Sequence, residues 1–223
     1  MKKQRASFIS SYGARAALLA FAFLFCMDDA YSSDSAEDNI DFSASSASEA
    51  VKQAIDWIQD RRDNRYLPFA IIDKNNSGIF VFDTKSKFLA SGPVLLGIAR
   101  YDRIDPKTLN SSLSKIAADQ RVTPSGRYWA ILGKDHNGKK MLWIDPEYAI
   151  ALHPVVDVPG QKRKTRLKTE TSKDNRITWG CINVSPVLFE TIITPVFKEK
   201  GGMIYILPEE PENKGLMQIG DTH

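Results

Sequence analysis

Cys181 and His153 are the residues of this chain whose types and positions are best suited to chemistry. Cys181 lies in the run NRITWGCINV, residues 175–184, between a glycine and an isoleucine. A cysteine at such a place is a buried apolar side chain, one half of a disulfide, or a nucleophile. A nucleophilic cysteine needs a base or a positive field that holds it as the thiolate near neutral pH.

Histidine is the usual base for a thiol, and the sequence contains three histidines. His223 is the last residue, and His136 lies in a polar hairpin turn. His153 alone ends an apolar stretch, residues 148–155, and precedes a proline that disfavours helix. We therefore predict His153 as the partner of Cys181. The structural alternative is a hydrogen-bonded histidine and a small buried cysteine that serve only packing.

The first 32 residues are typical of a secretory signal peptide. A basic start precedes twelve apolar residues, 16–27, which are too few to span a bilayer core that takes ~20. Small residues follow at Ala30 and Ser32, where we expect cleavage. The alternatives are an uncleaved anchor or lipidation at Cys26, although Phe25 is too large for the usual lipidation signal.

Removal of residues 1–32 leaves Cys181 as the single cysteine, so an internal disulfide is excluded. It also removes four basic and two acidic residues, which lowers the net charge from +3 to +1. Bulk charge thus gives no reason to expect nucleic-acid binding. We predict a periplasmic or exported protein without stable membrane insertion after cleavage, and the sequence leaves its oligomeric state open.

The remaining chain is predicted to hold one domain with short flanking segments. Residues 33–47 are small, polar and acidic, which is typical of a disordered leader. The domain is expected over residues 48–210 and a C-terminal tail over 211–223. With 43% hydrophobic and 26% charged residues, the composition is ordinary for a globular protein.

The patterning of the domain predicts a mainly β fold. We expect an N-terminal helix from Ser48, a short helix near 112–119, and a helix over 185–197 that follows Cys181. The basic stretch 160–176 lacks apolar periodicity and predicts a long exposed loop. Strands are expected at 69–73, 78–83, 87–97, 127–133, 139–145, 148–155 and 201–209, with an apolar run at 177–184. This content favours a β-sandwich or barrel-like sheet with helical additions.

The residues Thr178-Trp179-Gly180-Cys181-Ile182-Asn183, with His153 upstream, resemble the L,D-transpeptidase (YkuD-type) family of bacterial wall enzymes. The family motif is a histidine, an intervening stretch, and Ser/Thr-His-Gly-Cys-hydrophobic-Asn. TPSGRY, residues 123–128, and PVLLG, residues 93–97, are similar to elements that precede this motif, so the resemblance spans roughly residues 65–208.

Two features depart from the family pattern. Trp179 stands where the family has its second histidine, and 24 residues separate His153 from Thr178, several more than usual. The first histidine, which the family uses as the base, is kept. The tryptophan therefore bears on substrate specificity more than on thiol activation. RITWGCIN is also similar to a variant branch that carries Arg-Ile-Thr-x-Gly-Cys-Ile-Asn.

The resemblance implies a role for each motif residue. Cys181 attacks an acyl carbonyl, and His153 accepts the thiol proton and returns one to the leaving amine. The N–H of Cys181, with that of Gly180 or Trp179, faces the oxyanion. Gly180 lets the backbone approach the substrate without a Cβ. The predicted substrate-binding residues are Arg176, which meets a carboxylate, and Thr178, Trp179 and Asn183. No cofactor or metal is expected.

The implied substrates are peptidoglycan stem peptides, and the implied reaction is L,D-transpeptidation through a thioester on Cys181. If water accepts the acyl group, the protein is a carboxypeptidase or amidase instead. A catalytically silent wall-binding module is the alternative from another class. Papain-like and NlpC-type proteases are disfavoured, because they place the cysteine ahead of the histidine, and here only His223 follows Cys181.

Overall fold

Helix α1, Glu49–Arg61, begins where the sequence predicts it. The hydroxyl of Ser48 accepts a hydrogen bond from the N–H of Val51 at 3.3 Å, which is the usual N-cap arrangement. The backbone of Arg62 turns into the left-handed region and ends the helix. This computed structural model describes residues 47–109, 111–112, 115–169 and 172–209. The predicted signal peptide, the leader up to residue 46 and the tail 211–223 lie outside the described residues.

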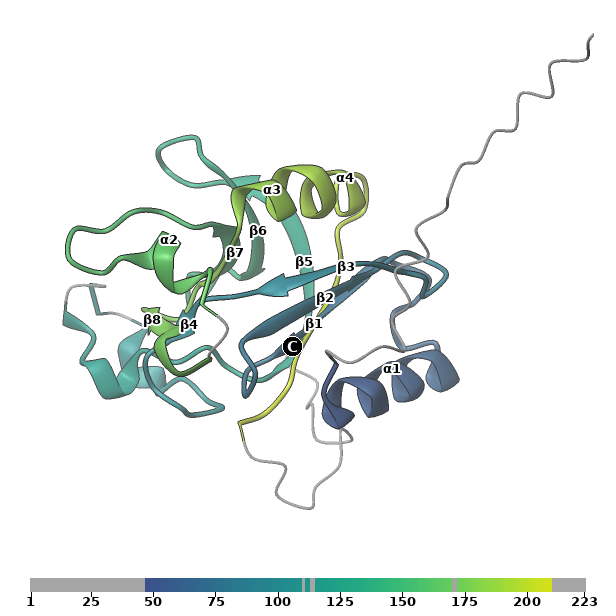
Figure 1. Ribbon diagram of the computed structural model, residues 1–223, viewed down its shortest axis with the longest axis horizontal. Helices are drawn as coiled ribbons and strands as arrows, with labels where there is room; N and C mark the ends of the chain where they lie inside the picture. Colours follow the sequence, from purple (N-terminus) through teal and green to yellow (C-terminus); the bar gives the residue numbers. More distant parts are fainter. Residues whose placement is uncertain (1–46, 110, 113–114, 170–171, 210–223) are drawn as a thin grey trace, which may run out of the picture. The chain divides into compact units, whose positions relative to one another are not determined.

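Within the described residues, eight strands form one sheet in the order β3-β2-β1-β10-β5-β6-β7-β9. Figure 1 labels β1, β2, β3, β5, β6 and β7 of this sheet. Their bounds are β1 Phe69–Asp73, β2 Gly78–Phe82, β3 Phe88–Pro93, β5 Gly126–Lys134, β6 Lys140–Asp145, β7 Ile150–Pro154, β9 Ile182–Val184 and β10 Gly202–Ile206. Neighbours are antiparallel except for β1 with β10 and β7 with β9. A separate parallel pair joins β4, Leu96–Gly97, to β8, Arg176–Thr178.

The two ends of the large sheet meet near the candidate site. Leu95, just beyond β3, exchanges backbone hydrogen bonds with Asn183 of β9, with N···O distances of 2.9 and 3.0 Å. This contact nearly closes the sheet into a barrel and satisfies backbone groups that an open edge would expose. The predicted mainly β, barrel-like fold with an N-terminal helix and a helix after Cys181 is confirmed.

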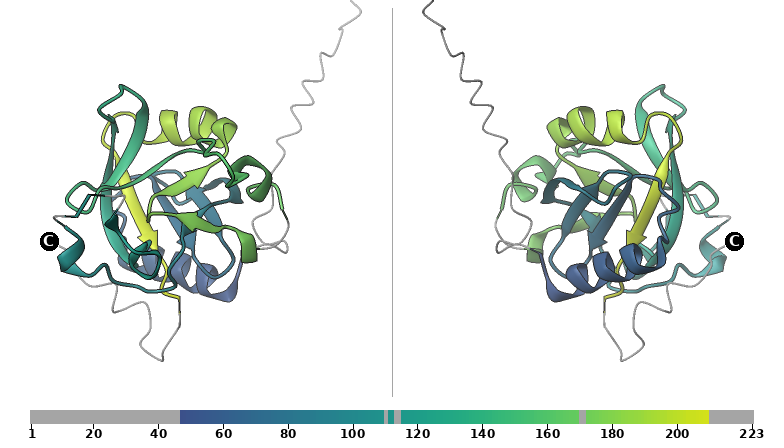
Figure 2. Two further views of the ribbon diagram at one scale, coloured as in Figure 1. Left: turned by 90° about the vertical axis from the view of Figure 1, so that its left-hand side faces the viewer. Right: turned by 90° about the vertical axis from the view of Figure 1, so that its right-hand side faces the viewer.

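Two hydrophobic clusters cover the two faces of the central strands. The apolar face of α1 packs on one side of β1, β2 and β10, with Phe69 and Tyr205 in this cluster. The other cluster fills the barrel interior and includes Leu152, Ile182 and the helix that follows β9. Both views in Figure 2 show this helix and α1 at opposite ends of the strand region. Strands β1 and β10 are buried throughout because both of their faces are covered.

The helix after Cys181 is continuous but changes its winding. It consists of α3 Pro186–Leu188, a π-helical turn η5 Phe189–Ile193, and α4 Thr194–Val196. Ser185 caps it through a hydrogen bond from Leu188 N to its hydroxyl at 3.1 Å, as predicted. Pro195 has no N–H to donate in the α pattern, and the π turn comes directly before the segment that contains it.

The connecting segments differ from two predictions. Residues 160–176 are not a plain exposed loop, because they form helix α2 Arg163–Arg166, the 3₁₀ turn η4 Ser172–Asp174 and the start of β8. Leu167 is buried there and packs with Leu95 and Val155. Of the helix expected near 112–119, residues 113–114 lie outside the described residues, and its end coincides with the 3₁₀ turn η3 Ala118–Gln120. Another 3₁₀ turn, η1 Pro106–Thr108, precedes that range. None of the described helices has the length and apolar character needed to cross a membrane.

Candidate active site

The site lies on the face of β7 and β9 that points away from the barrel interior. Cys181 directly precedes β9, and the parallel register pairs Leu152 with Ile182 and His153 with Asn183. Side chains alternate along a strand, so Leu152 and Ile182 enter the core while His153, Asn183 and Cys181 share the other face. The tertiary structure thus brings the two predicted reactive residues to one face of two neighbouring strands.

Gly180 makes the sharp turn that presents Cys181. Its φ is +135°, a conformation that residues with side chains rarely adopt. A Cβ at this position would lie 2.5 Å from the carbonyl oxygen of Val122 and 2.8 Å from Cδ1 of Ile150. Glycine is therefore required here both by backbone geometry and by close packing against two other segments.

A buried threonine connects this turn to the two upstream elements that the resemblance singled out. The hydroxyl of Thr123 donates to the carbonyl of Gly180 at 2.8 Å and accepts from the N–H of Gly97 at 2.9 Å. Beneath it, Nζ of Lys74 donates to the carbonyl of Thr123 at 3.1 Å and to Oδ1 of Asp102 at 2.6 Å. The residues 93–97 and 123–128 thus hold the cysteine turn in place.

Lys74 is a supporting residue that no motif in the sequence singles out. Its side chain is fully buried, and burial lowers the pKa of its ammonium group while Asp102 opposes that shift. The available signal was its position directly after the apolar strand at 69–73. A lysine there is placed to extend its ammonium group under a loop from the end of that strand.

Thr178 stabilises the turn from the other side. Its hydroxyl donates to the carbonyl of Cys181 at 2.7 Å and accepts from the N–H of Gly180 at 3.2 Å. Thr178 is buried and its hydrogen bonds stay within the loop, so its observed role is to hold the turn. The Gly180 N–H is likewise engaged within the loop, which removes it from the expected oxyanion donors in this conformation.

A chain of hydrogen bonds fixes the protonation state of His153. Nη1 of Arg163 lies 3.3 Å from Oδ1 of Asn183, and because arginine only donates, this amide oxygen is the acceptor. Nδ2 of Asn183 lies 3.0 Å from Nε2 of His153, so Nε2 carries the lone pair. Nδ1 then donates to the carbonyl of Pro154 at 2.9 Å. His153 is the neutral Nδ1–H tautomer, in agreement with burial, which lowers its pKa.

The thiol of Cys181 is turned toward a carbonyl. Its Sγ lies 3.4 Å from the carbonyl oxygen of Ala149, to which the thiol donates. Burial raises the pKa of Cys181, while the N–H of Ala151, the charge of Arg163 and the N–H of Cys181 itself lower it. In the described part of the chain no hydrogen bond joins Cys181 to His153. The catalytic pairing of these two residues stays a prediction.

Trp179 forms a wall of the pocket next to Cys181. The guanidinium carbon of Arg121 lies 4.3 Å from the centre of the indole ring, and that of Arg163 lies 6.0 Å from it. A cavity of about 180 Å³ opens beside the ring. Its walls come from the segments around η1, η3 and the β6–β7 connection, and include Ile104, Val122, Glu147, Tyr148, Trp179 and Cys181.

Arg163 is a functional candidate that its sequence context does not indicate. The basic stretch 160–176 predicts an exposed loop, but only 6% of the surface of Arg163 is exposed. Helix α2 lies beside β7 (Figure 1), and the cluster of Leu95, Val155 and Leu167 holds the segment against the barrel. The signal in the sequence was Leu167, one apolar residue within a polar stretch, which marks the side of the segment that packs.

Arg176 is placed differently from the expectation that it meets a substrate carboxylate. Its side chain is buried, and Nη2 donates to the carbonyl of Lys74 at 2.7 Å and to the carboxylate of Glu209 at 2.9 Å. Burial lowers the pKa of Arg176 and Glu209 opposes that shift. In this structure the carboxylate that Arg176 binds belongs to the chain itself, which gives the residue a structural role.

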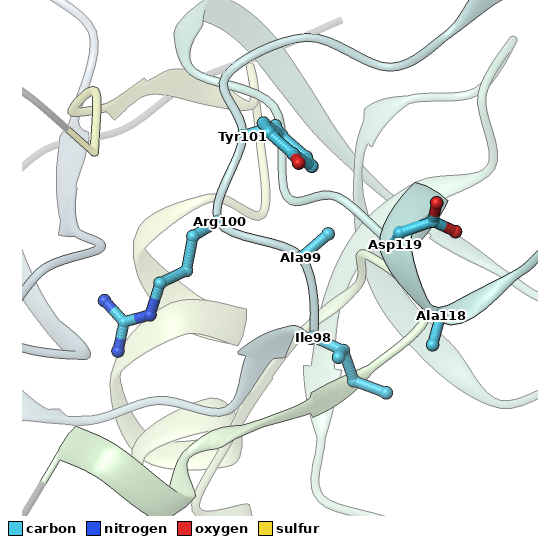
Figure 3. A pocket seen from close by; sticks show the side chains of 6 residues that line it. All are labelled: Ile98, Ala99, Arg100, Tyr101, Ala118 and Asp119. Atoms are coloured by element: carbon cyan, nitrogen blue, oxygen red, sulfur yellow. The ribbon is translucent and has the colours of Figure 1, made fainter.

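A second hollow, of about 350 Å³, lies between residues 98–101 and η3. Figure 3 shows Ile98 to Tyr101 on one side and Ala118 and Asp119 on the facing segment, with Arg100 directed away from them. It is the larger of the two cavities, but its lining contains no cysteine or histidine. The smaller cavity is therefore the candidate active site.

Comparisons with known proteins gave matches only among solved structures. No family model and no curated protein matches the chain. The catalytic domain of the E. faecium L,D-transpeptidase is 16% identical, with a TM-score of 0.33, over 63% of this chain and 96% of that one. The LD transpeptidase LdtMt1 in complex with imipenem is 13% identical, with a TM-score of 0.36, over 63% of this chain and 58% of that one.

A third match is the helical cell shape determining protein Pgp2 from Campylobacter jejuni, as a single-residue variant. It is 14% identical, with a TM-score of 0.39, over 74% of this chain and 58% of that one. Similarities this loose assign neither a family nor an activity. What the described residues establish is a mainly β barrel that carries Cys181 at the wall of a cavity, on the same strand face as His153 and Asn183. The buried Arg163 of α2 donates a hydrogen bond to Asn183.

Proposed function

We propose that this protein is an exported, L,D-transpeptidase-like cysteine acyltransferase that acts on peptidoglycan stem peptides. The observation that supports the proposal most is the placement of Cys181. It follows a turn that only glycine fits, lies at the wall of a cavity, and shares a strand face with a neutral histidine. The motif around it supplies the reaction class, since the fold alone supports many chemistries.

The neutral state of His153 suits a general base, because Nε2 has a lone pair that accepts a proton. In the described conformation Asn183 occupies that lone pair. Proton transfer from Cys181 therefore requires Nε2 to exchange the Asn183 amide for Sγ. Sγ then attacks the acyl carbonyl, the C–N bond breaks, and the leaving amine takes the proton from His153. An acceptor amine attacks the resulting thioester, its proton passes to His153, and Sγ is released.

The direct test is mass spectrometry of muropeptides after incubation with the purified protein. Cross-linked stems support the acyltransferase, and trimmed stems show that water is the acceptor and the protein is a hydrolase. A carbapenem, which the resemblance implies as an acylating agent, is expected to add one drug mass to Cys181. The Cys181→Ala variant is expected to lose both the adduct and turnover. The proposal is refuted if the wild type gives no muropeptide product and no carbapenem adduct under conditions that label an L,D-transpeptidase.

A second candidate is a catalytically silent wall-binding module. It is favoured by the raised pKa of Cys181 and by the engagement of the His153 lone pair with Asn183. Trp179→His separates the two candidates, since it restores the residue found in the family. If the wild type is already labelled by carbapenem, the variant is expected to change only which stem peptides react. If only the variant is labelled, the silent module is the correct reading.

A further inference from the structure

Arg163 is a buried cation for which the described chain offers no carboxylate. Nε donates to Oε1 of Gln161 at 2.6 Å, and Nη1 donates to Oδ1 of Asn183 at 3.3 Å. Both partners are neutral amides. No Asp or Glu of the described residues lies within ion-pair distance of this guanidinium. A buried charge is costly unless an anion compensates it, so an anion is expected at this place.

Two contacts of Arg163 lie on either side of Cys181 in the sequence. Its guanidinium faces Trp179 and bonds to Asn183, the residues two positions before and two positions after the cysteine. Asn183 and Cys181 share one face of β9. The attraction between Arg163 and the Cys181 thiolate favours the charged form of both groups. The Cys181 thiol is thus the acidic group of the described chain whose ionised form the Arg163 guanidinium favours.

The other ionisable groups around the thiol do not replace this cation. His153, on β7, is neutral by its hydrogen bonds. Arg121 lies with its guanidinium carbon 4.3 Å from the centre of the Trp179 ring, and no hydrogen bond among the described residues joins it to Cys181. Glu147, in the wall of the cavity, is an acidic residue and supplies no cation. Among the described residues, Arg163 is the buried cation that contacts both Trp179 and Asn183 and whose attraction lowers the pKa of Cys181.

We propose that Arg163 is a positioning residue whose charge favours ionisation of the Cys181 thiol and makes its pocket selective for reagents that carry an anionic group beside the reacting carbon. The inference deepens the proposed function and rests on it for the biological substrate. Its test reads the thiol itself with simple alkylating reagents, in which Sγ forms a bond to carbon and iodide leaves. Failure of the acyltransferase assays therefore leaves the role of Arg163 open to this test. Failure of the alkylation test likewise leaves the proposed acyltransferase activity open to its own assay.

The test is the rate of Cys181 alkylation by iodoacetamide as a function of pH, followed by intact-protein mass spectrometry. Arg163→Gln is expected to move the midpoint of the profile to higher pH and to slow alkylation at pH 7 about tenfold, which corresponds to about one pKa unit. Arg163→Lys keeps the charge and is expected to restore part of the rate. Lys164→Gln is the matched control, because it removes one positive charge from the exposed side of the same helix.

The pH profile separates an electrostatic role from a structural one. A structural defect changes access to the thiol at every pH, whereas loss of the cation shifts the midpoint. A folded Arg163→Gln variant with the midpoint and the rate at pH 7 of the wild type would overturn the proposal. So would an equal shift in Lys164→Gln.

A measurement on the wild type alone covers the case in which the Arg163 variants do not fold. Iodoacetate is an anion and iodoacetamide is a neutral analogue of the same size. We expect the ratio of their rates at Cys181 to exceed the ratio measured for free cysteine at the same ionic strength, and to fall when salt is added. A ratio equal to or below that of free cysteine would overturn the proposal.

Discussion

The Gly180→Ala substitution is the most incisive test of how the chain presents Cys181. An alanine at φ near +135° costs about 1–3 kcal/mol in backbone strain. Its Cβ would also lie 2.5 Å from a carbonyl oxygen of the neighbouring segment, so the backbone must shift. Overpacking of this kind costs about 1–3 kcal/mol more. We expect the variant to lose about 2–6 kcal/mol of unfolding free energy. This is a large part of the total of about 5–15 kcal/mol that is usual for a native protein.

Gly138→Ala is the matched control, because it separates strain from close packing. Gly138 also has a positive φ, +78°, but a Cβ there meets no atom within 4 Å. We expect a loss of about 1–2 kcal/mol from strain alone. Both variants are compared with the wild type by urea denaturation, followed by tryptophan fluorescence. The comparison is valid if the slope of unfolding free energy against urea concentration is the same in all three proteins.

The second readout is the alkylation rate of Cys181 under native conditions. A shift of the turn at residue 180 moves the thiol relative to Ala149 and Asn183, so the rate in Gly180→Ala is expected to differ from the wild type. The rate in Gly138→Ala is expected to be unchanged, since this hairpin turn lies outside the walls of the cavity. Equal stability losses in the two variants would refute the argument that the Cβ clash, rather than φ alone, requires glycine at position 180.

His153→Ala is expected to slow carbapenem acylation of Cys181 by about 10²–10⁴-fold, as for a lost general base, while His136→Ala has no effect; equal rates in the two would remove His153 from the mechanism. Because burial lowers the pKa of His153, the unfolded state binds the proton more readily than the folded state. The unfolding free energy is therefore expected to fall as the pH drops below about 6.5. In denaturation curves, a His153→Gln variant should lose less unfolding free energy between pH 7 and pH 5 than the wild type. Thr123→Val removes the hydroxyl that joins Gly97 N–H to the Gly180 carbonyl and is expected to cost about 1–3 kcal/mol, since two buried polar groups lose their partner; Thr191→Val, on an exposed helix surface, should cost less, and equal losses would contradict this role.

Local patterns in the sequence predicted helix α1, the strands at Cys181 and His153, and the helix after Cys181. The polar cap at Ser48 and the apolar spacing after it define α1, because a helix begins where a side chain satisfies its first free N–H groups. Alternating and fully apolar runs define the strands, and a helix follows Cys181 because Ser185 and Pro186 suit its first turn. The mainly β class follows from this content. Cys181 and His153 stand out because cysteine and histidine are rare in the chain.

The sequence did not reveal which residues meet across the barrel. Pairing of β7 with β9 and the contact of Leu95 with Asn183 depend on strand order, and strand order is set by burial of the whole sheet rather than by any local pattern. The bond from Thr123 to Gly180 joins segments 57 positions apart, and Lys74 and Thr123 are 49 positions apart. Such contacts leave no periodic trace in either segment.

The charged residues show most clearly how the sequence-based expectation differs from the tertiary structure. In the sequence Arg163 and Arg176 both belong to one basic, polar stretch, and the expectation was a solvated loop with Arg176 free to bind a substrate carboxylate. The tertiary structure buries both: Arg176 against Glu209, which compensates its charge, and Arg163 between two amides beside Cys181. Sequence determines that a side chain is charged. Whether water, a carboxylate of the same chain or a reactive thiol faces that charge depends on which segments pack around it, and this is decided only when the barrel closes.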